Sequence, residues 1–206
     1  MQPCGALGVL GGTFDPIHLG HLILGEQVRE QLGLDRVLFV PSARPPHKLG
    51  DRIADAEHRL AMVELAVTSN PHFAVSRREL DRVGPSYTIT TIKELRSQGH
   101  GQVYFVLGAD AVLDLRSWRE PDELLRACQV VAAARPGFDL SRISRALGAE
   151  RASRVRVLDI PQIEISSTDL RQRVAAGRSL RYLVPDAVGD YIAEKGLYRV
   201  CADRDS

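Results

Sequence analysis

Short apolar runs alternate with segments of helical periodicity along nearly all of the 206-residue chain. Two of these runs, VLFV at residues 37–40 and VYFVL at residues 103–107, are apolar at every position. Continuous apolar runs of this length are typical of strands that are buried on both faces of a parallel sheet. The pattern predicts strands at residues 6–10, 36–40, 73–75, 103–107, 129–133 and 155–158.

The segments between these strands place apolar residues on one helical face. They predict helices at residues 19–32, 54–67, 88–96, 140–147, about 169–175 and 187–194. Strand and helix alternating about six times predict an α/β fold, a Rossmann-like doubly wound parallel sheet of about six strands with helices on both faces. A small C-terminal helical segment follows at about residues 167–196, and the length favours a single domain over residues 1–206.

The composition narrows the class of protein. Hydrophobic residues make up 44% of the chain and charged residues 26%, as in soluble globular proteins. A net charge of +1 gives no support to nucleic-acid binding. The three cysteines (Cys4, Cys128 and Cys201) are far apart, which suits a reducing cytoplasm and argues against a disulfide framework or a zinc site. We expect a cytoplasmic protein without membrane association, and the sequence leaves a homo-oligomer open.

The segment GGTFDPIHLGHL at residues 11–22 places His18 and His21 three residues apart where a strand ends and a helix begins. A metal site, a phosphate site and two ordinary surface histidines are the competing interpretations. A zinc site would need a third ligand, and the spacing of the other histidines provides none. A phosphate site explains more, because Asp15-Pro16 can initiate a helix whose first N–H groups are unpaired. Glycines around the pair would let an anion approach the backbone: Gly11, Gly12 and Gly20.

A second candidate anion site is IEISSTDLR at residues 163–171. Ser166 or Ser167 can cap a helix there, and Arg171 follows about one helical turn later, on the same side of the helix. A simple capping sequence explains the pattern as well as a phosphate site does, so both interpretations stay open from these residues alone. Neither the GxGxxG pattern of dinucleotide oxidoreductases nor the GxxxxGK[ST] pattern of P-loop proteins occurs in the chain.

Taken together, GGTFDPIHLGHL and ISSTDLR resemble the signatures of the HxGH nucleotidyltransferases. Further stretches, in the same order along nearly the whole chain, resemble bacterial nicotinate mononucleotide adenylyltransferases: PSARPPHK at 41–48, GPSYTITTI at 84–92, LGADAVLDLRSW at 107–118 and YLVPDAVGDYI at 182–192. The HxGH motif alone is moderately specific, whereas the first five of these stretches, up to ISSTDLR at residues 165–171, are highly specific when found together in order.

The resemblance implies a role for each matching residue. His18, His21 and Arg171 would be catalytic and would contact the phosphates of ATP. The remaining ATP-binding residues would be Gly12, Thr13, Phe14, Asp110, Ser166, Ser167 and Thr168. The residues that bind nicotinate mononucleotide would be Lys48, Ser86, Tyr87, Thr88, Trp118 and Arg135. No protein metal site is expected, and Mg²⁺ would arrive bound to ATP, held by phosphate oxygens and water.

The implied reaction is adenylyl transfer from ATP to nicotinate mononucleotide, which gives nicotinate adenine dinucleotide and pyrophosphate in NAD biosynthesis. The alternatives are a phosphopantetheine adenylyltransferase, which has similar GTFDP and ISS stretches, and a non-catalytic ATP-binding regulatory module. The PPHK and SYTITT stretches argue against the first, and the intact His18, His21 and Arg171 argue against the second. Residues 84–91 contain no lysine or arginine, so backbone donors are expected to select the acid over the amide.

Overall fold

The computed structural model describes residues 5–43, 53–135, 137–161 and 163–199. Six strands form one sheet in the order β3-β2-β1-β4-β5-β6, and every pair of neighbours is parallel. All six predicted strands are confirmed, with bounds of β1 (Leu7–Gly12), β2 (Arg36–Pro41), β3 (Phe73–Val75), β4 (Val103–Gly108), β5 (Gln129–Ala134) and β6 (Val155–Asp159). This order is that of a Rossmann-like sheet.

The predicted helices are also confirmed, as α1 (Leu19–Leu32), α2 (Ala56–Val67), α3 (Thr88–Ser97), α6 (Ser141–Leu147), α8 (Ser167–Ala175) and α9 (Asp186–Lys195). Four short segments were not predicted: α4 (Ala109–Leu113), η1 (Leu115–Ser117), α5 (Pro121–Ala127) and α7 (Ala149–Ala152). Each is too short to show a clear helical period in the sequence. None of the helices in the described ranges is long and apolar enough to cross a membrane.

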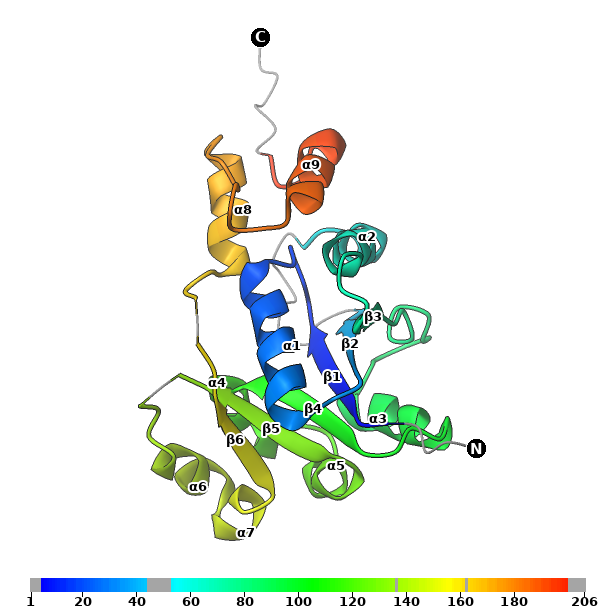
Figure 1. Cartoon of the computed structure of the whole chain (residues 1–206), viewed down its shortest axis with the longest axis vertical. Helices are drawn as coiled ribbons and strands as arrows, with labels where there is room; N and C mark the ends of the chain where they lie inside the picture. Colours follow the sequence, from blue (N-terminus) through cyan, green and yellow to red (C-terminus); the bar gives the residue numbers. More distant parts are fainter. Residues whose placement is uncertain (1–4, 44–52, 136, 162, 200–206) are drawn as a thin grey trace.

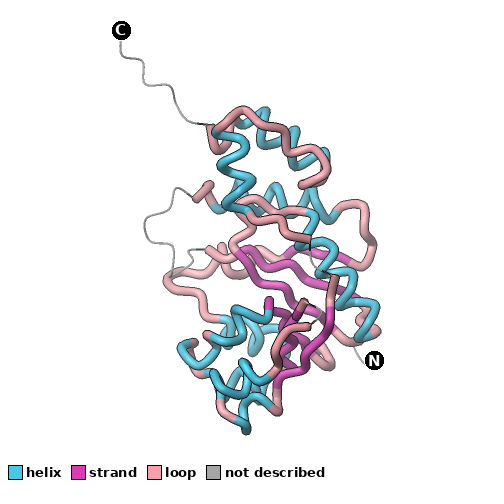
Figure 2. The backbone as a smooth tube through the Cα atoms, turned by 90° about the vertical axis from the view of Figure 1, so that its left-hand side faces the viewer, coloured by secondary structure: helices cyan, strands magenta, loops and turns pink. Residues whose placement is uncertain are grey.

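Helices cover both faces of the sheet because successive strand residues point to opposite sides. In β2, Val37 and Phe39 join the core cluster that α1, α2, α8 and α9 complete. Leu38 and Val40 join the second cluster, which α3, α4, α5 and α6 complete. Figure 2 shows the strands grouped between these helical segments. The doubly wound prediction is therefore confirmed.

The two ends of the sheet carry different helices. Helices α8 and α9 lie at the upper end of the molecule in Figure 1, whereas α5, α6 and α7 lie at the lower end. The order of connections reverses at β1, which pairs with β2 on one side and with β4 on the other. Ligands of such sheets bind beyond the carboxyl ends of the strands at this reversal, which places the candidate site after Gly12.

The beginning of α1 differs from one sequence expectation. The helix starts at Leu19, and His18 is its N-cap residue, so Asp15-Pro16 does not initiate it. The peptide bond between Asp15 and Pro16 is cis, and the Asp15 side chain is buried. The turn therefore directs an aspartate into the protein before the helix begins.

The C-terminal helices share the core of the sheet. Leu170 of α8 and Val188 of α9 are fully buried in the same cluster as Leu10 and Phe14. Because one cluster spans both regions, we propose that the described parts of the chain fold as one cooperative domain.

Replacing Leu170 with alanine tests this proposal. Leu170→Ala should lower the free energy of unfolding by about 2–5 kcal/mol, since it removes buried methyl groups and leaves a cavity. Urea unfolding followed by Trp118 fluorescence and by far-UV circular dichroism should give coincident transitions. The control is Val83→Ala, at a side chain that is 99% exposed. Loss of helical signal before the Trp118 signal changes would contradict a single domain.

Candidate active site

The buried side chain of Asp15 joins four segments of the chain, and we call this arrangement the Asp15 junction. Its Oδ1 accepts hydrogen bonds from the Ala54 N–H at 3.2 Å and from the Tyr198 hydroxyl at 2.7 Å. Arg171 Nη1 donates to the Asp15 main-chain carbonyl at 2.9 Å and lies 3.6 Å from Oδ2. Burial and the Asp15 charge raise the pKa of Tyr198, which therefore stays a hydrogen-bond donor.

His18 and His21 form a stacked pair at the start of α1. Their ring centroids lie 3.7 Å apart at an interplanar angle of 27°. The main-chain N–H of His18 donates to Nδ1 of His21 at 3.2 Å, and the Phe14 ring packs edge-on against His21 with 5.1 Å between centroids. The structure thus brings the two histidines together on the first turn, as their spacing predicts.

Both histidines are neutral near pH 7. Burial lowers the pKa of His18 to about 4. Burial also lowers the pKa of His21, and the neighbouring His18 lowers it further. Because Nδ1 of His21 accepts a hydrogen bond, its proton resides on Nε2, which is left as a donor. The pair can therefore donate hydrogen bonds to phosphate without carrying a permanent charge.

The glycines of this segment make room for its own side chains. A Cβ atom on Gly20 would lie 3.0 Å from Nδ1 of His18, and one on Gly12 would lie 3.0 Å from the Phe14 ring. The sequence suggested that these glycines admit a ligand to the backbone. The structure adds a second requirement, because a side chain at either position would crowd His18 or Phe14.

The N-terminus of α8 lies against the segment that leads into α1 (Figure 1). Ser166 caps α8 by accepting from the Asp169 N–H at 3.1 Å, as the capping interpretation predicts. Ser167 Oγ donates to the Pro16 carbonyl at 2.9 Å, and Arg171 Nη2 donates to Thr168 Oγ1 at 3.3 Å. The positive N-terminal ends of α1 and α8 and the guanidinium of Arg171 therefore lie close together. This arrangement suits phosphate groups.

A cavity of about 450 Å³ lies beside this region at the carboxyl ends of β1, β2 and β4. Its apolar wall includes Val9, Val40, Phe105, Leu107 and Trp118. Six of the predicted site residues meet around it: Gly12, Thr13, Ser86, Tyr87, Thr88 and Trp118. Helix α3 begins at Thr88 with Tyr87 as its N-cap residue, as predicted. The cavity can hold a flat aromatic ring and present it with a few polar groups.

An arginine that the sequence did not indicate also lies at this cavity. Arg119 lines it, and its Cζ lies 5.1 Å from the centroid of the Tyr87 ring. Arg119 is distant in sequence from residues 84–91, so the charge count of that stretch did not include it. The cavity also contains Glu79, whose pKa is raised by burial and whose Oε1 accepts from Thr91 at 2.7 Å. The guanidinium of Arg119 thus lies at the same cavity where the sequence predicts backbone N–H donors from residues 84–91.

Two predicted residues, Asp110 and Arg135, are not brought into these two clusters. Asp110 follows β4 but forms an ion pair with Arg142 of α6 at 3.7 Å. Arg135 follows β5 and forms an exposed ion pair with Glu164 at 3.0 Å. Lys48 lies outside the described residues. Within the described ranges there is no group of three or more histidine, cysteine or acidic side chains that could hold a metal ion.

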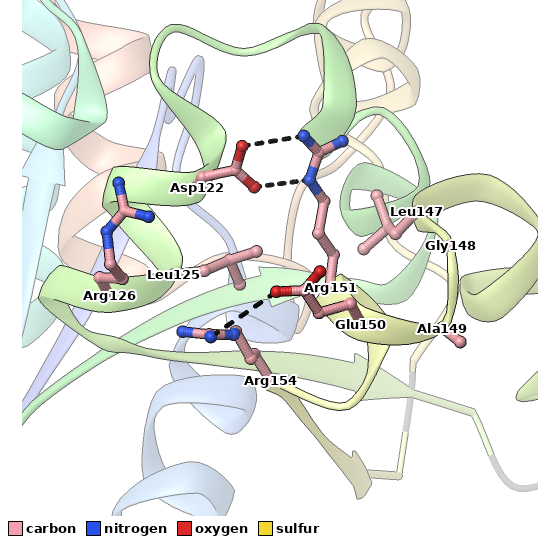
Figure 3. A pocket seen from close by; sticks show the side chains of 9 residues that line it. All are labelled: Asp122, Leu125, Arg126, Leu147, Gly148, Ala149, Glu150, Arg151 and Arg154. Atoms are coloured by element: carbon pink, nitrogen blue, oxygen red, sulfur yellow. Dashed lines mark hydrogen bonds and ion pairs between the residues drawn. The ribbon is translucent and has the colours of Figure 1, made fainter.

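A second cavity, of about 470 Å³, lies between α5 and the residues around α7 (Figure 3). Asp122 accepts two hydrogen bonds from Arg151, at 2.6 and 2.9 Å. Glu150 forms an ion pair with Arg154, with 3.9 Å between Oε1 and Nη2. Arg154 directly precedes β6, so this cavity is at the amino ends of the strands. Its paired charges and its position make it a poorer candidate than the cavity at Trp118.

Comparisons with known proteins agree with this site. Residues 9–173 match the cytidylyltransferase-like family. Proteins named "Probable nicotinate-nucleotide adenylyltransferase" from Moorella thermoacetica and Thermus thermophilus are each 48% identical to this chain. The alignments cover 95% and 94% of this chain and 92% and 99% of those proteins.

The fold is also similar to solved structures of Plasmodium falciparum nicotinic acid mononucleotide adenylyltransferase, complexed with APC and with NaAD. The TM-scores are 0.72 and 0.74, the identities are 18% and 19%, and both matches cover 94% of this chain and 97% of the other. The family match and the close relatives together establish that the chain belongs to the cytidylyltransferase-like family, among the nicotinate-nucleotide adenylyltransferases.

Proposed function

We propose that this protein transfers the adenylyl group of ATP to nicotinate mononucleotide, giving nicotinate adenine dinucleotide and pyrophosphate in NAD biosynthesis. The supporting observation is the close placement of two different environments after β1. A ring-sized apolar cavity lies on one side, and two helix N-termini with Arg171 lie on the other. These environments suit a pyridine ring and a triphosphate, and the names of the close relatives agree.

In the proposed reaction a phosphate oxygen of the acceptor attacks the α-phosphorus of ATP. A new P–O bond forms as the bond to the bridging oxygen of the pyrophosphate breaks, and the electron pair leaves with pyrophosphate. The nucleophile is already an anion, so no general base is needed. The protein contributes alignment and stabilisation of the negative charge that develops on the leaving group.

The ATP phosphates are proposed to lie between the histidine pair and the start of α8. His18 and His21 donate ring N–H groups, and Arg171 donates its planar guanidinium. The remaining nucleotide contacts are assigned to Gly12, Thr13, Phe14, Asp110, Ser166, Ser167 and Thr168. MgATP is the substrate form, with the ion held by phosphate oxygens and water. The free Oδ2 of Asp15 is buried and faces Arg171, which argues against its serving as a metal ligand.

The pyridine ring of the acceptor is proposed to occupy the cavity beside Trp118. Tyr87, Ser86 and Thr88 surround the carboxylate end of the ring, where the first N–H groups of α3 can donate. Arg119 adds a guanidinium at the same wall, where its Nε lies 3.6 Å from Oε1 of Glu120. The resemblance also assigns Lys48 and Arg135 to nicotinate mononucleotide; for Arg135 this contact would have to replace its ion pair with Glu164.

A pyrophosphate-release assay distinguishes the candidate functions. With MgATP, nicotinate mononucleotide should support turnover, whereas 4′-phosphopantetheine should not. Turnover with 4′-phosphopantetheine instead would favour the related adenylyltransferase activity. ATP binding without turnover on any acceptor would favour a regulatory module and would contradict the proposal.

Removing the His21 side chain should slow the chemical step. His21→Ala should lower kcat about 100-fold or more with a smaller effect on KM, because it removes a preorganised donor to the transferring phosphates. In the unmodified protein, kcat/KM for ATP should show no histidine titration near pH 6.5, because the pKa of His18 is about 4. Near-normal turnover of a folded His21→Ala variant would refute the assignment.

The acid should be preferred to the amide. We expect kcat/KM for nicotinate mononucleotide to exceed that for nicotinamide mononucleotide by at least about tenfold, because N–H donors facing an amide NH₂ stay unpaired. Arg119→Gln should lower the value for the acid by about tenfold and leave the value for the amide nearly unchanged. The control is Arg116→Gln, an exposed arginine of η1 that does not line the cavity. An unchanged acid-to-amide ratio in Arg119→Gln would show that backbone donors suffice.

A further inference from the structure

Arg59 of α2 is a buried arginine that the reaction as described does not use. Its side chain is 1% exposed, and its guanidinium donates four hydrogen bonds to main-chain carbonyls. Nε donates to Ala54 at 3.0 Å, Nη1 donates to Thr13 and to Ser42 at 2.8 Å each, and Nη2 donates to Ala43 at 3.0 Å. One side chain therefore ties together three separate stretches of the chain.

A buried charge at this position calls for an explanation. The other buried residues of α2 are apolar: Leu60, Met62, Val63, Ala66 and Val67. Removing a guanidinium from water is costly, and the cost is offset only where hydrogen bonds satisfy its donors. Burial lowers the pKa of Arg59, while the nearby Asp15 charge favours its protonated form. An apolar side chain would fill the core at lower cost, so the bonds to the carbonyls are the distinguishing property of Arg59.

Two of the four carbonyls that Arg59 binds belong to residues in the wall of the proposed acceptor cavity. Thr13 follows β1 and Ser42 follows β2, and both residues line the cavity. Thr13 is also two residues before Asp15, from which the chain continues to the histidine pair. The Ser42 N–H donates to the Gly12 carbonyl at 2.9 Å, so the two loops leave the sheet side by side. Arg59 bridges them just beyond this bond.

We propose that Arg59 is a positioning residue for adenylyl transfer. Its planar fork fixes the loop after β1, which leads to the ATP-binding histidines, relative to the loop after β2, which forms part of the acceptor cavity. The acceptor phosphate and the α-phosphorus of ATP are thereby held in line. Alignment of two substrates is a large part of catalysis when no general base is used, and small displacements lower the rate steeply. This inference rests on the proposed function.

The Arg59→Lys variant tests whether the planar guanidinium is required. Lysine keeps the positive charge but offers all its N–H donors from one nitrogen. In steady-state assays with MgATP and nicotinate mononucleotide, Arg59→Lys should lower kcat at least about tenfold, with KM for each substrate changing less than about threefold. The matched control is Met62→Ala, which removes a fully buried apolar side chain from the same helix and breaks no hydrogen bond to either loop. It should lower Tm and leave kcat within about twofold of the unmodified protein.

Rescue by a small molecule gives a second readout. Methylguanidinium at non-denaturing millimolar concentration should raise the kcat of Arg59→Ala at least about fivefold and should not change that of Met62→Ala. Circular dichroism reports folding in the same samples. If methylguanidinium restores the helical signal of Arg59→Ala but not its kcat, the positioning role is overturned. Because folding and kcat are measured in the same samples, this test also applies if the variant folds poorly.

Two further results would also overturn the proposal. One is an Arg59→Lys variant whose kcat equals that of a Met62→Ala protein with the same loss of Tm. The other is a loss expressed entirely in KM. Absence of pyrophosphate release by the unmodified protein would instead refute the proposed function, so the two failures are distinguishable.

Discussion

The carboxylate of Asp15 holds the two halves of the candidate site together. A buried charge is tolerated only when its surroundings satisfy it, and here the partners of the carboxylate are the Ala54 N–H before α2, the Tyr198 hydroxyl after α9 and the guanidinium of Arg171 in α8. The C-terminal helices must therefore dock on the segment that follows β1. Docking there sets the N-terminus of α8 against that of α1 and holds Arg171 beside the histidine pair.

Charged groups of both signs meet around this junction. Asp15 lies near the guanidinium groups of both Arg59 and Arg171, of which the first is fully buried and the second largely so. Asp55 also lies near Arg59, so two carboxylates face two guanidinium groups, and two helix N-termini add their positive dipole ends. His18 and His21 are neutral and contribute directed N–H groups. A site of this kind attracts a triphosphate near neutral pH without depending on the protonation of histidine.

Much of the fold followed from the sequence because β2 and β4 are continuous apolar runs and the longer helices show a clear period. The histidine pair and the Ser166 cap were also predictable, since their contacts are local in sequence. The bonds from Arg171 and Tyr198 to Asp15 span 156 and 183 residues, and no local pattern indicates them. Strand ends likewise placed Asp110 and Arg135 at the correct edge of the sheet without showing that each forms an ion pair with a neighbour. Arg119 was missed because its approach to Tyr87 depends on tertiary packing.

A crystal structure with a non-hydrolysable MgATP analogue and nicotinate mononucleotide tests the central claim most directly. The triphosphate should lie between Nε2 of His21 and the guanidinium of Arg171, with the pyridine ring in the cavity beside Trp118. An acceptor phosphate oxygen should then lie about 3–3.5 Å from the α-phosphorus, in line with the leaving pyrophosphate. A triphosphate bound elsewhere, such as in the cavity between α5 and α7, would contradict the proposed role of the Asp15 junction.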